Sequence, residues 1–308
     1  MRIDRLAARY FNRHPLLRRL LWPAGAVLVF FIFLILTFPY ELLARRIEME
    51  ARRAGAEVTI GSAGAGGLAA VRARDVRVRL GAPGGEPGPE LRFERAVVSP
   101  DLIALILRRT SFGFSLQGYG GTASGHVALS SDPRQPGISS FRIDANDLDL
   151  AALPLRELAG VVGAGKLKLK ADLPVLVPVE TARGAVTLAV EGAAVNGGSA
   201  AGFSLPKTAL GRVDGSVTVE KGVARVEKTQ ARGGDVEADL DGSINLRPLL
   251  SLSQADLHVR LRPGDRWLNE NAVIKGMIGL IQNARQGDGS YVFTLTGPLS
   301  RLQPQPGR

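Results

Sequence analysis

The chain has 308 residues, a formal net charge of +10 and no cysteine. Without cysteine there can be no disulfide bond, thiolate metal site or cysteine nucleophile. About half of the excess positive charge lies in residues 1–19, so the rest of the chain is only mildly basic. Aromatic residues make up 6% of the chain and offer few surfaces for base stacking. We therefore expect no nucleic-acid partner.

An uncharged apolar stretch, residues 20–40, follows the basic leader. As a helix, its 21 residues would reach about 31 Å, close to the ~30 Å hydrocarbon thickness of a bilayer. A cleavable signal peptide is the alternative, but no A-x-A motif follows the stretch. We expect an uncleaved transmembrane anchor made by Leu20, Leu21, Trp22, Val27, Phe30, Phe31, Phe33, Leu34, Leu36, Phe38 and Tyr40.

The charges on the two sides of this stretch predict its orientation. Residues 41–57 balance four arginines against four glutamates, whereas the leader is strongly basic. The positive-inside rule then places the N-terminus in the cytoplasm and the rest of the chain in the periplasm of a double-membrane bacterium. The expected protein crosses the inner membrane once, and its topology is set by Arg2, Arg5, Arg9, Arg13, Arg18 and Arg19.

Residues 41–57 predict a helix that ends near Gly55, and the glycine-rich residues 61–67 predict a turn. No Gly-Lys-Ser/Thr follows these glycines, so a phosphate-binding loop is disfavoured. Apolar residues then alternate along residues 68–80, and the alternation changes phase at Arg74-Asp75. Such a change needs one extra residue, which predicts a bulge that turns Val71 and Ala73 to the same side as Val76, Val78 and Leu80.

The remaining sequence repeats short alternating strands separated by Gly, Pro, Asn or Asp, with brief helices at 102–107, 149–158 and 271–285. The fold class is therefore mainly β: a transmembrane helix followed by a large, curved, mostly antiparallel sheet, either a half-closed groove or a sandwich. A packed sandwich core is the simpler interpretation. The expected organisation is a cytoplasmic leader (1–19), the anchor (20–40), a periplasmic β-rich domain (41–300) and a disordered tail (301–308).

No constellation of catalytic residues stands out. His14, His126 and His258 lie far apart, and no G-x-S-x-G is present. Four carboxylates at positions 235, 237, 239 and 241 would share one face of a strand, about 6.5–7 Å apart, which favours a solvated face over a calcium site. We predict no catalytic, cofactor-binding or metal-binding residue and therefore no enzyme.

Several segments carry a family resemblance. The basic leader, the single span, FPYELLARRIEMEARRAGAEVTIG, SPDLIALIL, GDVEADLDGSINLRP and DGSYVFTLTGPLSRLQPQP together resemble the type II secretion system protein N family. This resemblance implies an accessory inner-membrane component of the machine that exports folded proteins through the outer membrane, with inner-membrane and periplasmic secretion-platform proteins as partners. The first third is also similar to the start of AsmA-like proteins, which are membrane-anchored periplasmic β proteins linked to lipid transport.

Two functions follow from these resemblances. The first is a structural role in the secretion platform, in which exposed strand edges bind partner domains. The second is a lipid-binding or lipid-transfer module that holds lipid in an apolar groove. A sheet with a filled core favours the first function, and an open groove lined by Val, Leu and Phe favours the second. The C-terminal segments favour the secretion role.

Overall fold

The computed structural model describes residues 41, 45, 48–49, 56–67, 70–81, 87–132, 137–200, 203–249, 252–272, 274–276 and 284–307. The strands are β1 (Ala56–Ala65), β2 (Val71–Gly81), β3 (Pro87–Pro100), β4 (Ser111–Gly118), β5 (Gly121–Leu129), β6 (Ile138–Asp149), β7 (Val161–Val175), β8 (Arg183–Ala200), β9 (Phe203–Ser204), β10 (Lys207–Glu220), β11 (Val223–Arg232), β12 (Val236–Asn245), β13 (Gln254–Pro263), β14 (Tyr291–Pro298) and β15 (Gln303–Pro306). Short helices are α4 (Leu102–Ile106), α5 (Leu155–Ala159), the 3₁₀ turn η1 (Val179–Thr181) and α6 (Asp265–Glu270).

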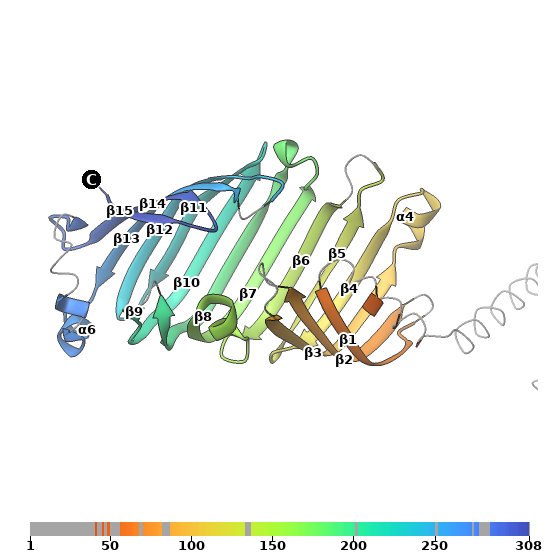
Figure 1. The fold of residues 1–308 in the computed structure, drawn as a ribbon, viewed down its shortest axis with the longest axis horizontal. Coiled ribbons are helices and arrows are strands. Elements are labelled where there is room, and N and C mark those ends of the chain that lie inside the picture. Colours follow the sequence, from red (N-terminus) through yellow and green to blue (C-terminus); the bar gives the residue numbers. More distant parts are fainter. Residues whose placement is uncertain are drawn as a thin grey trace, which may run out of the picture.

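These strands form one open antiparallel sheet in which nearly every strand pairs with the next one along the chain (Figure 1). The short β9 pairs only with β8, so β8 and β10 are neighbours in the sheet. In such a meander the connections alternate between the two ends of the strands. We call the end that carries α4 the upper rim and the end that carries α6 the lower rim, as Figure 1 draws them.

Strand register places apolar residues on one face across the whole sheet. Directly paired residues of antiparallel strands lie on the same face, so the pairing can be followed from strand to strand. One such row runs from β2 to β14 and holds Val71, Val98, Phe114, Gly125, Ile143, Ala171, Val186, Val217, Val226, Gly242, Leu257 and Leu295. All twelve members are apolar, and we call this side the apolar face.

No second sheet covers the apolar face among the described residues, since the strands form a single layer. Its buried residues are mostly alanines and valines that are covered by neighbours in the same sheet, such as Ala145 and Val190. The largest fully buried side chains in the described part of the chain are those of Ser253 and Ser290. A sandwich core would bury Leu and Phe instead. The sheet is therefore an open layer, and the sandwich interpretation is wrong.

Ala73 and Val76 lie on the same side of β2, as predicted, but the predicted bulge at Arg74-Asp75 is wrong, because no extra residue stands there. Asp75 has φ +49°, and Ala73 and Val76 on either side of it are buried in one cluster together with Ala96. Glycine stands close by on β1, where a Cβ at Gly61 would lie 3.1 Å from the Asp75 Cβ. The residue pairing of β2 with β1 and with β3 keeps the same register on both sides of this point. The distortion is therefore shared by adjacent strands.

A second line of distortions crosses the middle of the sheet. Asp147 on β6, Gly165 on β7, Gly192 on β8 and Gly211 on β10 all have φ between 58° and 125°. Register shifts accompany them in the β6–β7, β7–β8 and β8–β10 pairs. Bulges aligned across neighbouring strands bend a sheet and increase its twist. The sheet curls enough for β3 to contact α5, which lies in the β6–β7 connection.

At the two outer edges of the sheet the structure differs from two predictions. The glycine-rich residues 61–65 lie within β1 and do not form a turn, and the tail predicted to be disordered contains β15. Gly307 donates to the Val292 carbonyl, so the alternate positions Pro304 and Pro306 turn their nitrogens away from β14. Proline has no N–H, and the outer edge of β15 therefore lacks both of these donors.

The short helices agree in part with the sequence. The helix predicted at 102–107 is confirmed as α4, whereas the one predicted at 149–158 is the shorter α5 after a turn. Glu41, Arg45, Glu48 and Met49 are helical, as predicted, whereas the last two residues of the predicted segment 41–57 belong to β1. In the described residues no helix combines the length and the apolar character needed to cross a bilayer. The anchor predicted at 20–40 lies outside the described residues.

The shared cluster around Val76 generates a stability prediction. Val76→Asp places a carboxylate in an apolar site and should lower the free energy of unfolding by about 3 kcal/mol, as measured by urea unfolding of the protein in detergent. Arg72→Asp is the matched control on the same strand, because Arg72 is exposed, and it should cost no more than about 0.5 kcal/mol. Equal effects of the two variants would contradict this assignment of faces.

Candidate functional site

The apolar face is not covered by a second layer in the described part of the chain. Phe114 and Phe141 stack on it with ring centroids 6.3 Å apart. A Cβ at Gly125 would lie 2.7 Å from the end of the Phe114 ring, so glycine is needed there to let the ring rest on the sheet. The large side chains along the middle of the face, including Ile143, Leu169 and Leu188, are half-buried. Half-buried aliphatic side chains over many strands make a surface suited to an apolar ligand.

An apolar pocket of about 350 Å³ lies at the C-terminal end of the apolar face, against α6. Pockets that hold small ligands have volumes of about 300–1,000 Å³. Strands β10, β13 and β14 form the floor and α6 contributes a wall; the main lining residues are Leu205, Leu210, Leu261, Trp267, Tyr291 and Phe293. None of the described residues that line this pocket is charged. It can therefore hold hydrocarbon but offers no partner for a buried charge.

Local sequence explains how α6 comes to lie over the sheet. Pro263 ends β13, and the Gly264 N–H donates to the Asp235 carbonyl, which fixes the start of the helix beside β12. Asp265 stands in the first turn, where a negative charge stabilises the helix dipole. The Trp267 indole N–H points to the carbonyl of Lys207 on β10 at 3.4 Å. Trp267 thus connects the helix to a strand that is distant in sequence.

A hydrogen-bonded turn fixes the other end of the segment that contains α6. Asp288 accepts hydrogen bonds from the backbone N–H of Ser290 at 3.0 Å and from its hydroxyl at 2.6 Å, and it pairs with Arg262 on β13 at 2.8 Å. These hydrogen bonds, those of Ser290 first, hold the pKa of Asp288 well below its usual value. Because Ser290 precedes Tyr291, the turn positions the strand that forms part of the pocket floor.

The opposite face of the sheet is polar and carries cross-strand ion pairs. Arg142 pairs with Asp172 at 2.8 Å, Lys170 with Asp144 at 3.3 Å and Lys166 with Asp149 at 3.1 Å. The predicted row of carboxylates on β12 lies on this face: Asp239 pairs with Arg232, and Asp241 lies 3.3 Å from His258. No group of metal-ligating side chains gathers anywhere in the described ranges. Because these exposed ion pairs are hydrated, this face of the sheet is in contact with solvent.

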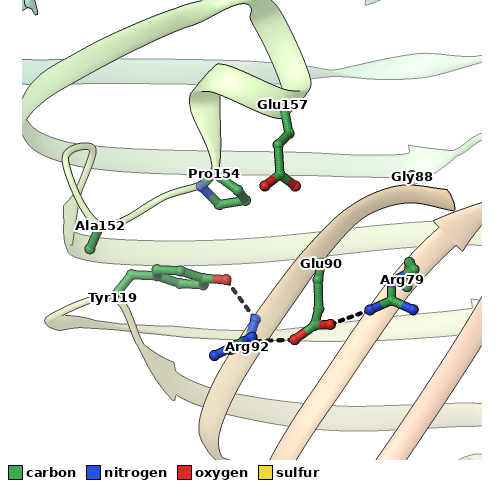
Figure 2. A pocket seen from close by; sticks show the side chains of 8 residues that line it. All are labelled: Arg79, Gly88, Glu90, Arg92, Tyr119, Ala152, Pro154 and Glu157. Carbon is green, nitrogen blue, oxygen red and sulfur yellow. Dashed lines mark hydrogen bonds and ion pairs between the residues drawn. The ribbon is translucent and has the colours of Figure 1, made fainter.

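A polar pocket of about 560 Å³ lies where β3 approaches α5 (Figure 2). Glu90 receives hydrogen bonds from Arg92 at 2.6 Å and from Arg79 at 2.5 Å. The Arg92 backbone N–H donates to the Tyr119 hydroxyl at 2.6 Å, and the Tyr119 ring meets Phe93 edge to face. Figure 2 shows Glu157 above this cluster, on the opposite wall. The cluster joins the second and third strands to the β4–β5 turn.

The charges in the polar pocket define what chemistry it can support. The hydrogen bond from Arg92 lowers the pKa of Glu90, and Arg79 adds to this effect. A general acid needs a raised pKa to hold its proton near neutral pH, so Glu90 is a poor proton donor. The described residues that line the pocket beside it include no Ser, Cys or His. The arrangement therefore fits a structural contact between β3 and the β6–β7 connection.

The functional residues that the sequence predicted are those of the membrane anchor and of the basic leader. The anchor residues of 20–40 and the leader arginines of 1–19 lie outside the described residues, so their roles stay predictions. Sequence reasoning missed the pocket under α6. A signal was present, since Trp267 is one of only two tryptophans and stands outside the apolar stretch in a chain of small residues.

Comparisons with known proteins give no identification: no family model, no curated protein and no solved structure matches the chain.

The turn at Asp288 generates a pH-dependent prediction. Asp288→Asn should lower the free energy of unfolding at pH 7, because the amide loses the ion pair and part of the turn. The folded pKa is lowered, so this stabilisation is complete above the unfolded pKa of about 3.9 and is lost as pH falls toward the folded value. Unfolding in urea at several pH values measures the difference between variant and wild type. A difference that grows on acidification would contradict the assignment.

Proposed function

We propose that this protein binds lipid acyl chains on the apolar face of its sheet, with the pocket under α6 as a subsite. The observation that carries the proposal is the open single layer: apolar side chains line one face over a dozen strands, and no second layer covers them in the described part of the chain. Leaving such an area in contact with water is costly at about 25 cal/mol per Å². A bound hydrocarbon chain removes that cost.

The chemistry of the face supports a flexible hydrocarbon ligand. The lining is aliphatic and aromatic, with alanine and glycine between the larger side chains, which gives a surface without fixed polar contacts. An acyl chain needs no hydrogen bonds, whereas a peptide would leave its N–H and C=O groups unsatisfied there. The predicted anchor and periplasmic location place the sheet beside a source of phospholipid. This assignment corresponds to the AsmA-like resemblance of the first third of the chain.

Photo-crosslinking tests the proposal. Full-length protein in vesicles that contain a phospholipid with a photoreactive group on one acyl chain should become labelled on the apolar face and in the pocket. Trp267→Ala should reduce labelling of the pocket by roughly tenfold, since a loss of about 1.4 kcal/mol in binding is a tenfold change. Mass spectrometry of the labelled peptides locates the cross-links.

Arg266→Ala is the matched control for this experiment, because Arg266 neighbours Trp267 but its side chain is exposed to water. It should leave labelling of the pocket unchanged. Labelling that is equal on the polar and apolar faces, or equal loss in both variants, would contradict acyl-chain binding in the pocket.

A role in the type II secretion platform is the second candidate, and the free edge of β1 favours it. No strand pairs with the outer side of β1 among the described residues, and Glu48 accepts a hydrogen bond from the Ile60 N–H on that strand at 2.9 Å. A free edge can accept a strand from a partner domain. The outer edge of β15 is less suited, because prolines remove its outward donors.

Copurification tests this second role. Full-length protein isolated by affinity from detergent-solubilised membranes should bring inner-membrane and periplasmic secretion-platform proteins with it. Val58→Pro removes an N–H on the outer side of the edge strand, because Val58 has the same alternation as Ile60, and it should reduce their recovery. Val58→Ala keeps this N–H and is the matched control for loss of the side chain. Recovery of phospholipid without any secretion protein would count against this role.

A further inference from the structure

Exposed aliphatic side chains are concentrated on the upper rim of the sheet. The residues at this rim are Ile103, Ile106, Leu107, Leu129, Ile138, Leu249, Leu252 and Leu299. They belong to the β3–β4, β5–β6, β12–β13 and β14–β15 connections or to the strand ends beside them, which the meander brings to one side. We call this set the aliphatic rim.

The lower rim differs in this respect. In the described ranges, only Met49 and Val98 are large exposed hydrophobic residues outside the aliphatic rim. Val98 stands near the end of β3 and so lies next to α4 on the upper side, while Met49 precedes the sheet. The turns of the lower rim, including α5 and α6, contribute none among the residues described there. Within the described residues, the exposed aliphatic side chains are therefore a property of the upper rim.

The helix α4, at the upper right of Figure 1, carries the two most exposed side chains of the aliphatic rim. Ile103 and Ile106 are 73% and 81% exposed, and Leu107 beyond the helix is 63% exposed. Asp101 accepts hydrogen bonds from the backbone N–H groups of Ile103 and Ala104, which fixes the start of the helix while Ile103 and Ile106 face solvent. The fold thus holds α4 in place without burying these side chains.

Two cations follow α4 directly. Arg108 and Arg109 are both exposed, and neither forms an ion pair with any described residue. Exposed aliphatic side chains next to unpaired arginines are the pattern of segments that enter the interface of an anionic bilayer, where the side chains reach about 5–10 Å below the headgroups. The charge at α4 complements acidic phospholipid headgroups.

The spacing of the aliphatic rim also favours a bilayer over a protein partner. The four connections extend over about ten strands, which corresponds to roughly 45 Å at ~4.8 Å per strand. Only Ile and Leu are present, in small groups at separate turns, whereas the centre of a protein interface is enriched in aromatic residues and arginine. Small apolar groups spread along a line fit a fluid surface that adapts to each of them.

We infer that the aliphatic rim inserts into the surface of an anionic phospholipid bilayer, with α4 as its principal contact. The sheet then lies with its upper rim on the membrane, and the apolar face opens beside the lipid. This inference goes beyond acyl-chain binding, and the two can fail separately, because rim insertion needs no lipid on the apolar face.

Fluorescence from single cysteines tests the inference, and the natural absence of cysteine makes the labelling specific. Ile106→Cys, Leu249→Cys and, as the lower-rim control, Glu157→Cys are each labelled with an environment-sensitive fluorophore in the full-length protein. The protein is reconstituted in vesicles of phosphatidylethanolamine and phosphatidylglycerol that contain a nitroxide-labelled lipid. We expect emission at shorter wavelength and strong nitroxide quenching at positions 106 and 249, and neither at 157.

Charge reversal measures how much the two arginines after α4 contribute to insertion of the aliphatic rim. Arg108→Glu with Arg109→Glu should weaken quenching at position 106, and vesicles without phosphatidylglycerol should do the same. Quenching at 106 and 249 that is no stronger than at 157 would overturn the inference. A shift to shorter wavelength without nitroxide quenching would overturn it too, since it would show that a second copy of the chain covers the rim.

Discussion

Hydrogen bonding between neighbouring strands holds this molecule together, because a single sheet has no second layer to pack against. Each strand depends on the strands beside it, and contacts between distant parts are few: β3 with α5, and the α6 segment with β10. Alanine is common at the buried positions since neighbouring side chains of the same sheet can cover a methyl group but not a leucine. Stability therefore comes mainly from the hydrogen bonds between neighbouring strands, and the apolar face is left free for a ligand.

Bulges and glycines bend the sheet and make room for side chains on the apolar face, where binding is proposed. The phase change at Asp75 keeps Val76 on the same side as Ala73, so the apolar face continues without interruption through the N-terminal strands. The line from Asp147 to Gly211 bends the strands in the middle of the sheet. Gly125 gives room for the Phe114 ring. The glycine-rich, aromatic-poor composition is thus a requirement of a curved single layer.

Much of the secondary structure could be predicted from local alternation, including β2 with its change of phase at Arg74-Asp75, β13, β14 and α4. At the two edges, the alternation of Val58 and Ile60 indicates only the first half of β1. Glycines conceal its second half and prolines conceal β15, and both segments are strands because the neighbouring strand offers hydrogen bonds. The number of layers also escaped prediction, since alternating residues look alike whether their apolar side meets a second sheet or a ligand. The pocket under α6 depends on residues far apart in sequence, from Leu205 to Phe293, which alternation does not connect.

The prolines of β15 have a consequence for self-association. Assembly of a fibre by strand addition requires two usable edges on each molecule, one to accept and one to extend. Here β1 has a free edge, while Pro304 and Pro306 remove the outward donors at the far end of the sheet. Two copies that paired through β1 would each present only a β15 edge to the next molecule. Growth would stop at a pair, so a chain with fifteen strands and an uncovered apolar side is protected against polymerisation by two residues at its end.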